Sequence, residues 1–138
     1  MDLARRFVVE VVAPVAADLD RKTNSEECFS SEIVERGSEY GLRTLTLLPE
    51  YGGGGADSVT TARVVEEIAK GDMGVAVVFA QTLKLIQSFQ AAATEEQRAR
   101  FLPQLRDDRR ALMAIGMTGR KRFISNGNRA LFRSMRDA

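Results

Sequence analysis

Through most of the first 110 residues, apolar side chains recur every third or fourth position, the spacing of one face of an α-helix. The first such helix is expected over residues 3–19, with a kink or break near residues 10–14 because Pro14 cannot donate a backbone hydrogen bond. This pattern predicts a mainly α-helical fold.

Capping residues mark where two further helices begin. Ser30 or Ser31 can cap a second helix that ends at Gly41. Asp57 caps a third helix that runs to about Ala69.

The segment from Met73 to about Gln90 is mostly apolar. Residues 75–79 alone could form a strand, but the apolar residues that follow favour a buried central helix. Thr94-Glu95-Glu96-Gln97 is a capping box that starts a fifth helix, which Pro103 should end or bend.

Beyond residue 110 the pattern changes from helices to strands. Strands are expected over residues 111–117, 123–125 and 130–132, the second followed by an Asn126-Gly127 turn. We therefore expect a helical domain over residues 1–110 and a short β remnant over 111–138.

The composition excludes several classes of site. The chain has no histidine, so it contains no Ser-His-Asp or Cys-His pair and no histidine-ligated zinc site. Its single cysteine, Cys28, cannot form an internal disulfide, and we interpret it as a small apolar filler. The longest apolar run, Val75–Ala80, is short and no signal peptide is visible, so we expect a cytoplasmic protein without a membrane partner.

The basic residues of 119–138 outnumber its only acid, Asp137. They could contact phosphates, but unpaired surface arginines explain them better, and nucleic-acid binding ranks last among the functions considered.

Adjacent Glu66 and Glu67 are the clearest candidate pair of acid–base carboxylates. Neighbouring helical residues point about 100° apart, so we interpret both as part of a solvated face. Arg63 and Glu67, and Glu66 and Lys70, stand four residues apart and should form exposed ion pairs.

Four consecutive glycines, Gly52–Gly55, precede the third helix. A phosphate-binding loop would continue with Gly-Lys-Ser/Thr, which is absent here, and Asp57 would repel an anion from the helix amino terminus. A flexible connector is the better interpretation.

Several short motifs share their order and spacing with one known family. They are APVA (13–16), YGL (40–42), LPEYGGGG (48–55), EEIAKGD (66–72), TEEQ (94–97), FLP (101–103) and AIGMT (114–118). With Phe7, they make residues 5–118 resemble the amino-terminal part of an acyl-CoA dehydrogenase. The resemblance implies a helical domain, then a β domain and a carboxy-terminal four-helix bundle.

The resemblance also implies FAD as cofactor, an acyl-CoA substrate and a role in fatty-acid metabolism. In the family a carboxylate removes the α proton of the thioester while the β hydride moves to the flavin. Ile115, Gly116, Met117 and Thr118 match one flavin-contacting strand, and Phe123, Ile124 and Ser125 match a second. A flat apolar wall with a few placed donors suits a flavin.

After Thr118 the sequence departs from the family. The family continues with an acidic residue, proline and a Gly-Ser-Asp run, whereas Gly119-Arg120-Lys121 follows here. We therefore expect a truncated family member without a catalytic or metal-binding residue of its own, inactive alone. The alternative is a non-catalytic helical interaction module, and in either case we expect a homo-oligomer because partner surfaces would be exposed.

Overall fold

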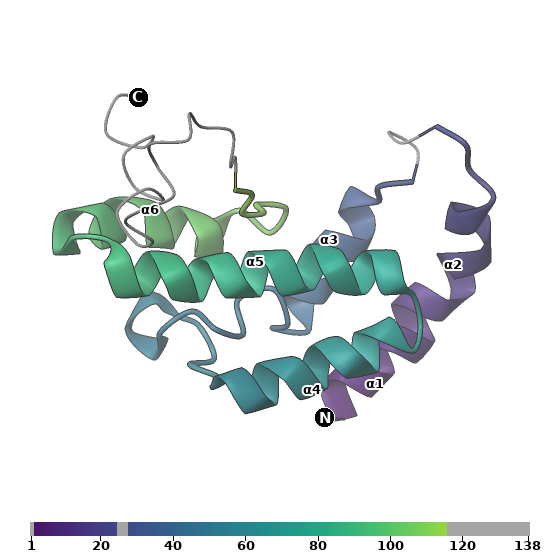
Figure 1. Cartoon of the computed structure of the whole chain (residues 1–138), viewed down its shortest axis with the longest axis horizontal. Coiled ribbons are helices and arrows are strands. Elements are labelled where there is room, and N and C mark those ends of the chain that lie inside the picture. The colour runs from purple at the N-terminus through teal and green to yellow at the C-terminus, as the bar shows by residue number, and fades with distance from the viewer. Residues whose placement is uncertain (1, 25–27, 116–138) are drawn as a thin grey trace, which may run out of the picture.

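The structure, a computed structural model, describes residues 2–24 and 28–115 and folds them into helices joined by turns (Figure 1). In chain order the elements are α1 (Asp2–Phe7), the π-helix η1 (Val8–Val12), α2 (Ala13–Asp20), α3 (Ser31–Glu39), the 3₁₀-helix η2 (Pro49–Tyr51), α4 (Ser58–Ala69), α5 (Met73–Ala92) and α6 (Glu95–Asp107). No strand occurs in these described ranges, and the predicted mainly α-helical fold is confirmed.

The predicted helix starts are confirmed by their caps. Ser30 and Asp57 each accept the backbone N–H three residues further on, at 3.3 and 2.7 Å. Thr94 and Gln97 form the complete capping box of α6. Helix α3 ends as predicted because Gly41 has a φ of 71°, in the left-handed region that favours glycine.

The amino-terminal helix passes Pro14 without stopping. Proline lacks an N–H, and its ring collides with the carbonyl four residues earlier in a regular helix. The chain widens into η1 just before Pro14, and the Ala13 N–H donates to the Val8 carbonyl five residues back. The expected disruption is therefore a change of helix type, after which α2 continues to Asp20.

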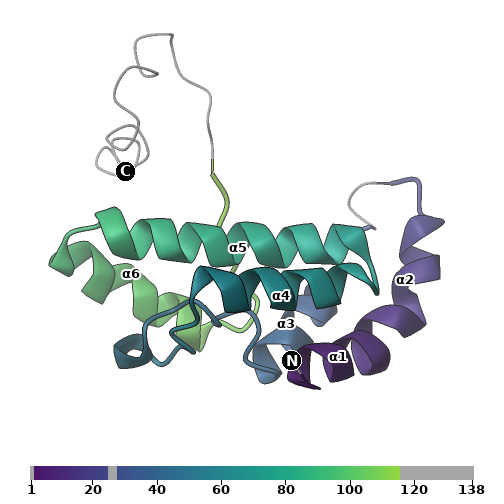
Figure 2. The same ribbon diagram turned by 60° about the horizontal axis from the view of Figure 1, so that its bottom comes forward.

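Helix α5 is the central element, so the helical interpretation of this segment is confirmed. In both views α4 runs beside it, and α6 follows it along its carboxy-terminal half (Figures 1 and 2). Two buried apolar clusters lie along α5. The first contains Ala4, Phe7, Val12, Ile33, Leu42, Val64, Ile68, Ala76 and Phe79, and the second contains Leu47, Ile86, Phe89, Ala93, Leu102 and Leu105.

By length and composition alone α5 could cross a membrane, since an 18-residue window of it has a mean hydropathy of 1.2. Half of that window is buried inside the structure. Core helices of globular proteins have the same character, so packing accounts for these apolar residues. The expected lack of a membrane partner stays a prediction.

The glycine-rich segment is packed, which makes the flexible-connector interpretation wrong. The Gly55 N–H donates to the Leu47 carbonyl at 2.8 Å. A Cβ at Gly53 would lie only 2.1 Å from the same carbonyl oxygen. The glycines are needed because backbone lies directly against backbone here.

Glu67 is not on a solvated face, contrary to expectation. Its side chain is 8% exposed, with Oε1 3.3 Å from Arg5 Nε and Oε2 2.6 Å from Lys70 Nζ. Lys70 thus pairs with Glu67 rather than with Glu66, which is exposed. The difference arises because α1 packs against α4 and places Arg5 there.

The structure also decides two expectations about single residues. Of the two effects predicted for Pro103, an end of the helix is excluded, because α6 continues to Asp107 with Leu102 and Leu105 buried on either side of the proline; a bend there stays a prediction. Cys28 is no buried filler but exposed, with Sγ 3.3 Å from the Asn24 carbonyl oxygen.

Residues 111–115, the described part of the expected strand 111–117, form no regular secondary structure. A strand needs a neighbour to exchange backbone hydrogen bonds. Here side chains bind that backbone instead: Arg43 donates to the Ala111 carbonyl, and Thr82 accepts the Met113 N–H. The remaining expected strands lie outside the described residues, so the domain division near residue 110 stays a prediction.

Candidate functional site

Of the residues expected to contact a flavin, one is described. Ile115 is half-buried at the carboxyl end of the described chain. The other six, Gly116, Met117, Thr118, Phe123, Ile124 and Ser125, lie outside the described residues, and their proposed contacts stay predictions. The candidate site is therefore the segment that leads from α6 to Ile115, together with the side chains that hold it.

An apolar groove with a volume of about 500 Å³ lies beside this segment. Its lining residues come from α5, α6 and the segment: Phe89, Phe101, Gln104, Leu105, Asp107, Asp108, Ala111 and Met113. The rings of Phe89 and Phe101 meet edge to face, with centroids 6.1 Å apart. Aromatic and aliphatic walls of this kind suit an apolar or flat ligand.

Both acids that line the groove, Asp107 and Asp108, already accept hydrogen bonds from neighbouring residues. Asp107 accepts two hydrogen bonds from Arg106, at 2.7 and 3.1 Å, and these hold the pKa of the Asp107 carboxyl below its ordinary value. Asp108 accepts the Arg110 backbone N–H at 2.9 Å. Neither acid is thus placed as an unengaged proton acceptor for a ligand in the groove.

Three carboxyl groups away from the groove have pKa values shifted in the same direction as that of Asp107. Among the described residues, each carboxyl group with a resolved pKa shift has its pKa lowered: Glu10, Asp57, Glu67 and Asp107. A general base for carbon acids normally has its pKa raised toward neutrality by burial. The described residues also contain no group of three or more possible metal ligands.

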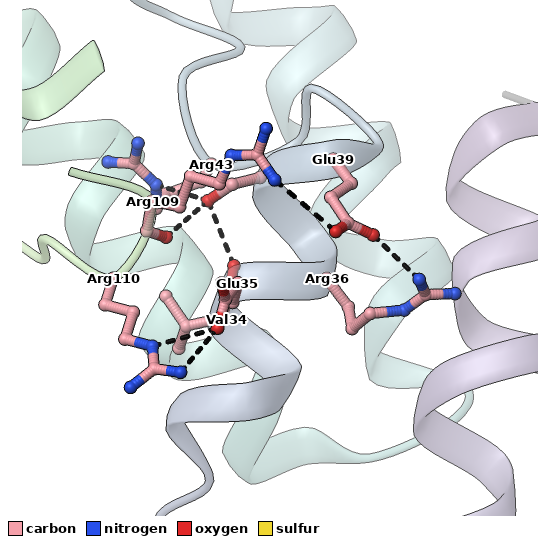
Figure 3. Close-up of polar contacts among 8 residues, drawn as sticks. Val34, Glu35, Arg36, Glu39, Arg43, Arg109 and Arg110 are labelled. Atoms are coloured by element: carbon pink, nitrogen blue, oxygen red, sulfur yellow. Dashed lines mark hydrogen bonds and ion pairs between the residues drawn. The ribbon is translucent and has the colours of Figure 1, made fainter. Parts of the chain in front are cut away.

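Arg43 is the buried centre of the candidate site (Figure 3). Arg43 is only 1% exposed. Its guanidinium donates hydrogen bonds to three different acceptors. Nη1 donates to the Ala111 carbonyl at 2.9 Å, Nη2 donates to the Leu105 carbonyl, and Nε donates to Ser38 Oγ at 2.6 Å. Burial lowers the pKa of the Arg43 guanidinium, with Asp108 acting weakly in the opposite direction, yet an arginine keeps its charge at neutral pH.

Ser38 extends this network to the next turn of the segment. Its hydroxyl accepts from Arg43 and lies 2.6 Å from the Arg109 carbonyl oxygen, to which it can donate. The Val34 carbonyl, at 3.0 Å, is the alternative acceptor for the same proton. Through Ser38, α3 reaches the backbone that follows α6.

Exposed ion pairs surround the buried network on the α3 side (Figure 3). Glu35 accepts from Arg110, with Oε2 2.7 Å from Nη2, and Glu39 lies 3.6 Å from Arg109. Glu39 also pairs with Arg36 at 2.7 Å. Such exposed pairs contribute little individually, but they place both arginines of the segment against α3.

Sequence reasoning missed Arg43, Ser38 and Thr82. Thr82 is 1% exposed in α5 and accepts the Met113 N–H at 3.4 Å. The available signal was a charged residue, Arg43, inside the apolar run from Leu42 to Leu48. A charge within such a run indicates a buried partner, because an unpaired buried charge is very costly.

Comparison with known proteins identifies the family to which this helical arrangement belongs. The family model described as "Acyl-CoA dehydrogenase, N-terminal domain" matches residues 1–108. The short/branched chain specific acyl-CoA dehydrogenase of Bos taurus is 30% identical over 116 residues, which is 83% of this chain and 26% of the relative. The short-chain specific acyl-CoA dehydrogenase of Clostridium acetobutylicum is 32% identical over 75% of this chain and 26% of the relative.

Relatives with other named reactions are also similar. The 3-sulfinopropanoyl-CoA desulfinase of Paraburkholderia xenovorans is 43% identical over 67 residues, which cover 49% of this chain and 16% of the relative. The chain thus spans about a quarter or less of the length of these relatives.

Proposed function

Because the chain belongs to the acyl-CoA dehydrogenase family, we propose that it is the helical part of a flavoprotein acting on an acyl-CoA thioester, and that it has no dehydrogenase activity alone. The observation that carries this proposal is the fixed path from α6 to Ile115. Arg43 and Thr82 hold the backbone of residues 111–113 against the helices, beside an apolar groove. The proposal requires helices that hold the backbone of this segment in a fixed position next to the cofactor.

The described residues beside Ile115 could form the apolar wall against one face of a flavin ring. Ala111 and Met113 line an apolar groove, and the half-buried Ile115 lies two residues after Met113. FAD, when bound, would supply the hydride acceptor for α,β-dehydrogenation. Ile115, Gly116, Met117 and Thr118, with Phe123, Ile124 and Ser125, would bind its ring and exclude water from it.

Inactivity of the chain alone is supported by its carboxyl groups. The family reaction needs a carboxylate to remove the α proton. The acids beside the groove, Asp107 and Asp108, are engaged by Arg106 and by a backbone N–H. The relative named as a desulfinase shows that family membership alone does not decide the reaction. The acyl-CoA substrate and its role in fatty-acid metabolism are therefore proposed only as a class.

Flavin absorbance tests both parts of the proposal. Purified chain is titrated with FAD, and the flavin spectrum is followed before and after anaerobic addition of a short-chain acyl-CoA. We expect a shifted spectrum on binding and no bleaching with the thioester. A spectrum identical to unbound FAD would refute cofactor binding, and bleaching of the flavin would refute inactivity.

A second candidate function is a non-catalytic association module, which a second groove with exposed apolar residues favours. This groove, with a volume of about 790 Å³, lies between α2, α3 and the start of α5. Phe29 and Met73 line it and are 48% and 67% exposed, and Val77 nearby is 52% exposed. Contiguous exposed apolar residues tend to mark contact surfaces.

Light scattering with size-exclusion chromatography tests this candidate. We expect a homo-oligomer that Met73→Lys combined with Val77→Lys shifts toward monomer. Leu3→Lys, at another exposed apolar position that is 54% exposed, is the matched control. A wild-type monomer at high concentration would contradict the association module.

We further propose a cytoplasmic location without nucleic-acid or membrane binding. The exposed thiol of Cys28, which has no second cysteine in the chain to form a disulfide with, suits a reducing compartment. Cell fractionation and salt-dependent binding of duplex DNA and anionic vesicles test these statements.

A further inference from the structure

We propose that Arg43 is a positioning residue that sets where, and in which direction, the flavin-facing segment leaves the helical domain. This inference rests on the proposed function, since it assigns a purpose to the segment that ends at Ile115. Arg43 touches neither cofactor nor substrate in this proposal. It acts through the backbone of residues 105–111.

The contacts of Arg43 join parts of the chain that are far apart in sequence. Its guanidinium binds the carbonyls of Leu105 and Ala111, which are 62 and 68 residues away. Through Ser38 it reaches the carbonyl of Arg109, which is 71 residues from Ser38. Within residues 105–111, Arg43 therefore fixes two carbonyls directly and a third, that of Arg109, through Ser38. Figure 3 shows Arg43 beside Arg109.

These carbonyls have no regular partner of their own. The last four carbonyls of any α-helix lack an intrahelical donor, and Leu105 is within the last turn of α6. Ala111 and Arg109 lie beyond the helix, in backbone that forms no ladder. A planar guanidinium with five N–H donors can bind several such acceptors at once, whereas a lysine ammonium or a neutral amide cannot span them.

The burial of Arg43 shows that this arrangement is specific. Arg43 is 1% exposed, and among the described residues no carboxylate is in hydrogen-bond contact with it, so this cation is stable only if its donors are bound in well-placed positions. Movement of residues 105–111 would break those bonds together. Arg43 thus allows essentially one path for the backbone that precedes Ile115.

Thr82 continues the same restraint closer to the flavin-facing residues. Its Oγ1 accepts the Met113 N–H, so the last restrained amide lies two residues before Ile115. Arg43 and Thr82 come from different elements, which means that the segment is tied to both the 42–48 loop and α5. Together, the hydrogen bonds of Arg43 and Thr82 fix both the position and the direction of the backbone that leads to Ile115.

Amide hydrogen exchange of the purified chain tests Arg43→Met, which keeps the apolar stem and removes the donors. We expect the Ala111 and Met113 amides to exchange on the order of tenfold faster or more, because several charge-assisted hydrogen bonds are lost. Amides in the middle of α5 should keep their protection. Unchanged exchange at Ala111 and Met113 would overturn the inference.

Two companion variants keep the test decisive. Gln90→Met is the matched control, because Gln90 is also buried and holds loop backbone by two hydrogen bonds, but at Thr46 and Leu48. It should leave exchange at Ala111 and Met113 unchanged, and equal loosening there would overturn a specific role for Arg43. Ser38→Ala removes only the hydrogen bonds that run through the Ser38 hydroxyl, so it is the variant to measure if Arg43→Met does not fold. It should raise the rate of amide exchange in residues 109–113.

FAD titration separates this inference from the proposed function. We expect wild type and Gln90→Met to bind FAD with the same absorbance shift, and Arg43→Met to bind it at least about tenfold more weakly. If wild type binds and Arg43→Met binds equally well, the positioning inference fails and the proposed function stands. If wild type does not bind FAD, the proposed function fails, while the exchange data still decide whether Arg43 orders residues 105–113.

Discussion

Replacing Gly37 by alanine tests how closely α3 packs on α5. A Cβ at Gly37 would lie 2.3 Å from Phe79 Cζ and 2.6 Å from Phe79 Cε1. Phe79 cannot easily retreat, because it is 1% exposed and its ring meets Phe7 at a centroid distance of 5.5 Å. The substitution therefore forces buried rings or the helix backbone to shift.

Two opposing terms set the size of the effect. Inserting a methyl group into a packed core costs about 1–3 kcal/mol. Alanine in place of glycine within a helix favours folding by about 0.5–1 kcal/mol. The overpacking term wins, so Gly37→Ala should lower the free energy of unfolding by about 1–2 kcal/mol, with a loss in Tm of about 3–4 °C per kcal/mol for a chain of 138 residues.

Urea unfolding followed by far-ultraviolet circular dichroism measures this change. Gly74→Ala is the matched control: Gly74 is an exposed glycine in α5 whose added Cβ would meet only Asp72 Oδ1, at 3.2 Å. Because alanine also favours a helix over glycine, its unfolding free energy should stay unchanged or rise by up to about 1 kcal/mol. Pairing Gly37→Ala with Phe79→Leu should recover part of the loss, because the smaller side chain makes room.

The reasoning is refuted if Gly37→Ala is as stable as wild type or more stable. It is also refuted if the effects of Gly37→Ala and Phe79→Leu simply add. Either result would mean that Phe79 is not the group that limits the space at Gly37.

Three further substitutions test other parts of the fold. Lys70, and to a smaller extent Arg5, hold the pKa of the Glu67 carboxyl below its ordinary value. Its ion pairs therefore contribute their full stabilisation above the ordinary carboxyl pKa of about 4.3. This stabilisation is lost as the pH falls through the lower pKa of Glu67 in the folded state. Glu67→Gln should therefore be less stable than wild type near neutral pH, with the gap closing on acidification; a gap independent of pH in urea titrations would argue against ion pairing. Thr94→Ala removes the capping box and should cost about 1 kcal/mol, measured by the same unfolding assay, and no loss would contradict a role for the cap. Leu102→Ala, at a position 0% exposed, should cost about 2–5 kcal/mol in thermal unfolding, and a cost below that of an exposed leucine would contradict the packing described.

The starts of the helices were predictable because capping is a local interaction. Ser30, Asp57 and Thr94 each accept an N–H only three residues further along the chain. The stop at Gly41 likewise depends on the conformation of one residue. Such features need no knowledge of what packs against the helix.

The interpretation of side-chain roles failed where a distant segment intervenes. Glu67 looked like a surface acid, yet Arg5, from another helix, is one of its partners. The glycines of 52–55 looked like a flexible connector, yet their backbone lies against Leu47. Helical periodicity separates an apolar face from a polar one, but it does not identify the neighbour that will cover a polar residue.

The order of the motifs and the helical periodicity determined the family and the mainly α-helical fold, since both depend on residue types at short spacing. Only the tertiary structure decided that Arg43 is buried and that residues 105–111 are tied to it. The physical reason is that the bonds of Arg43 join residues more than 60 positions apart, and only the packing of the helices brings their donors and acceptors together.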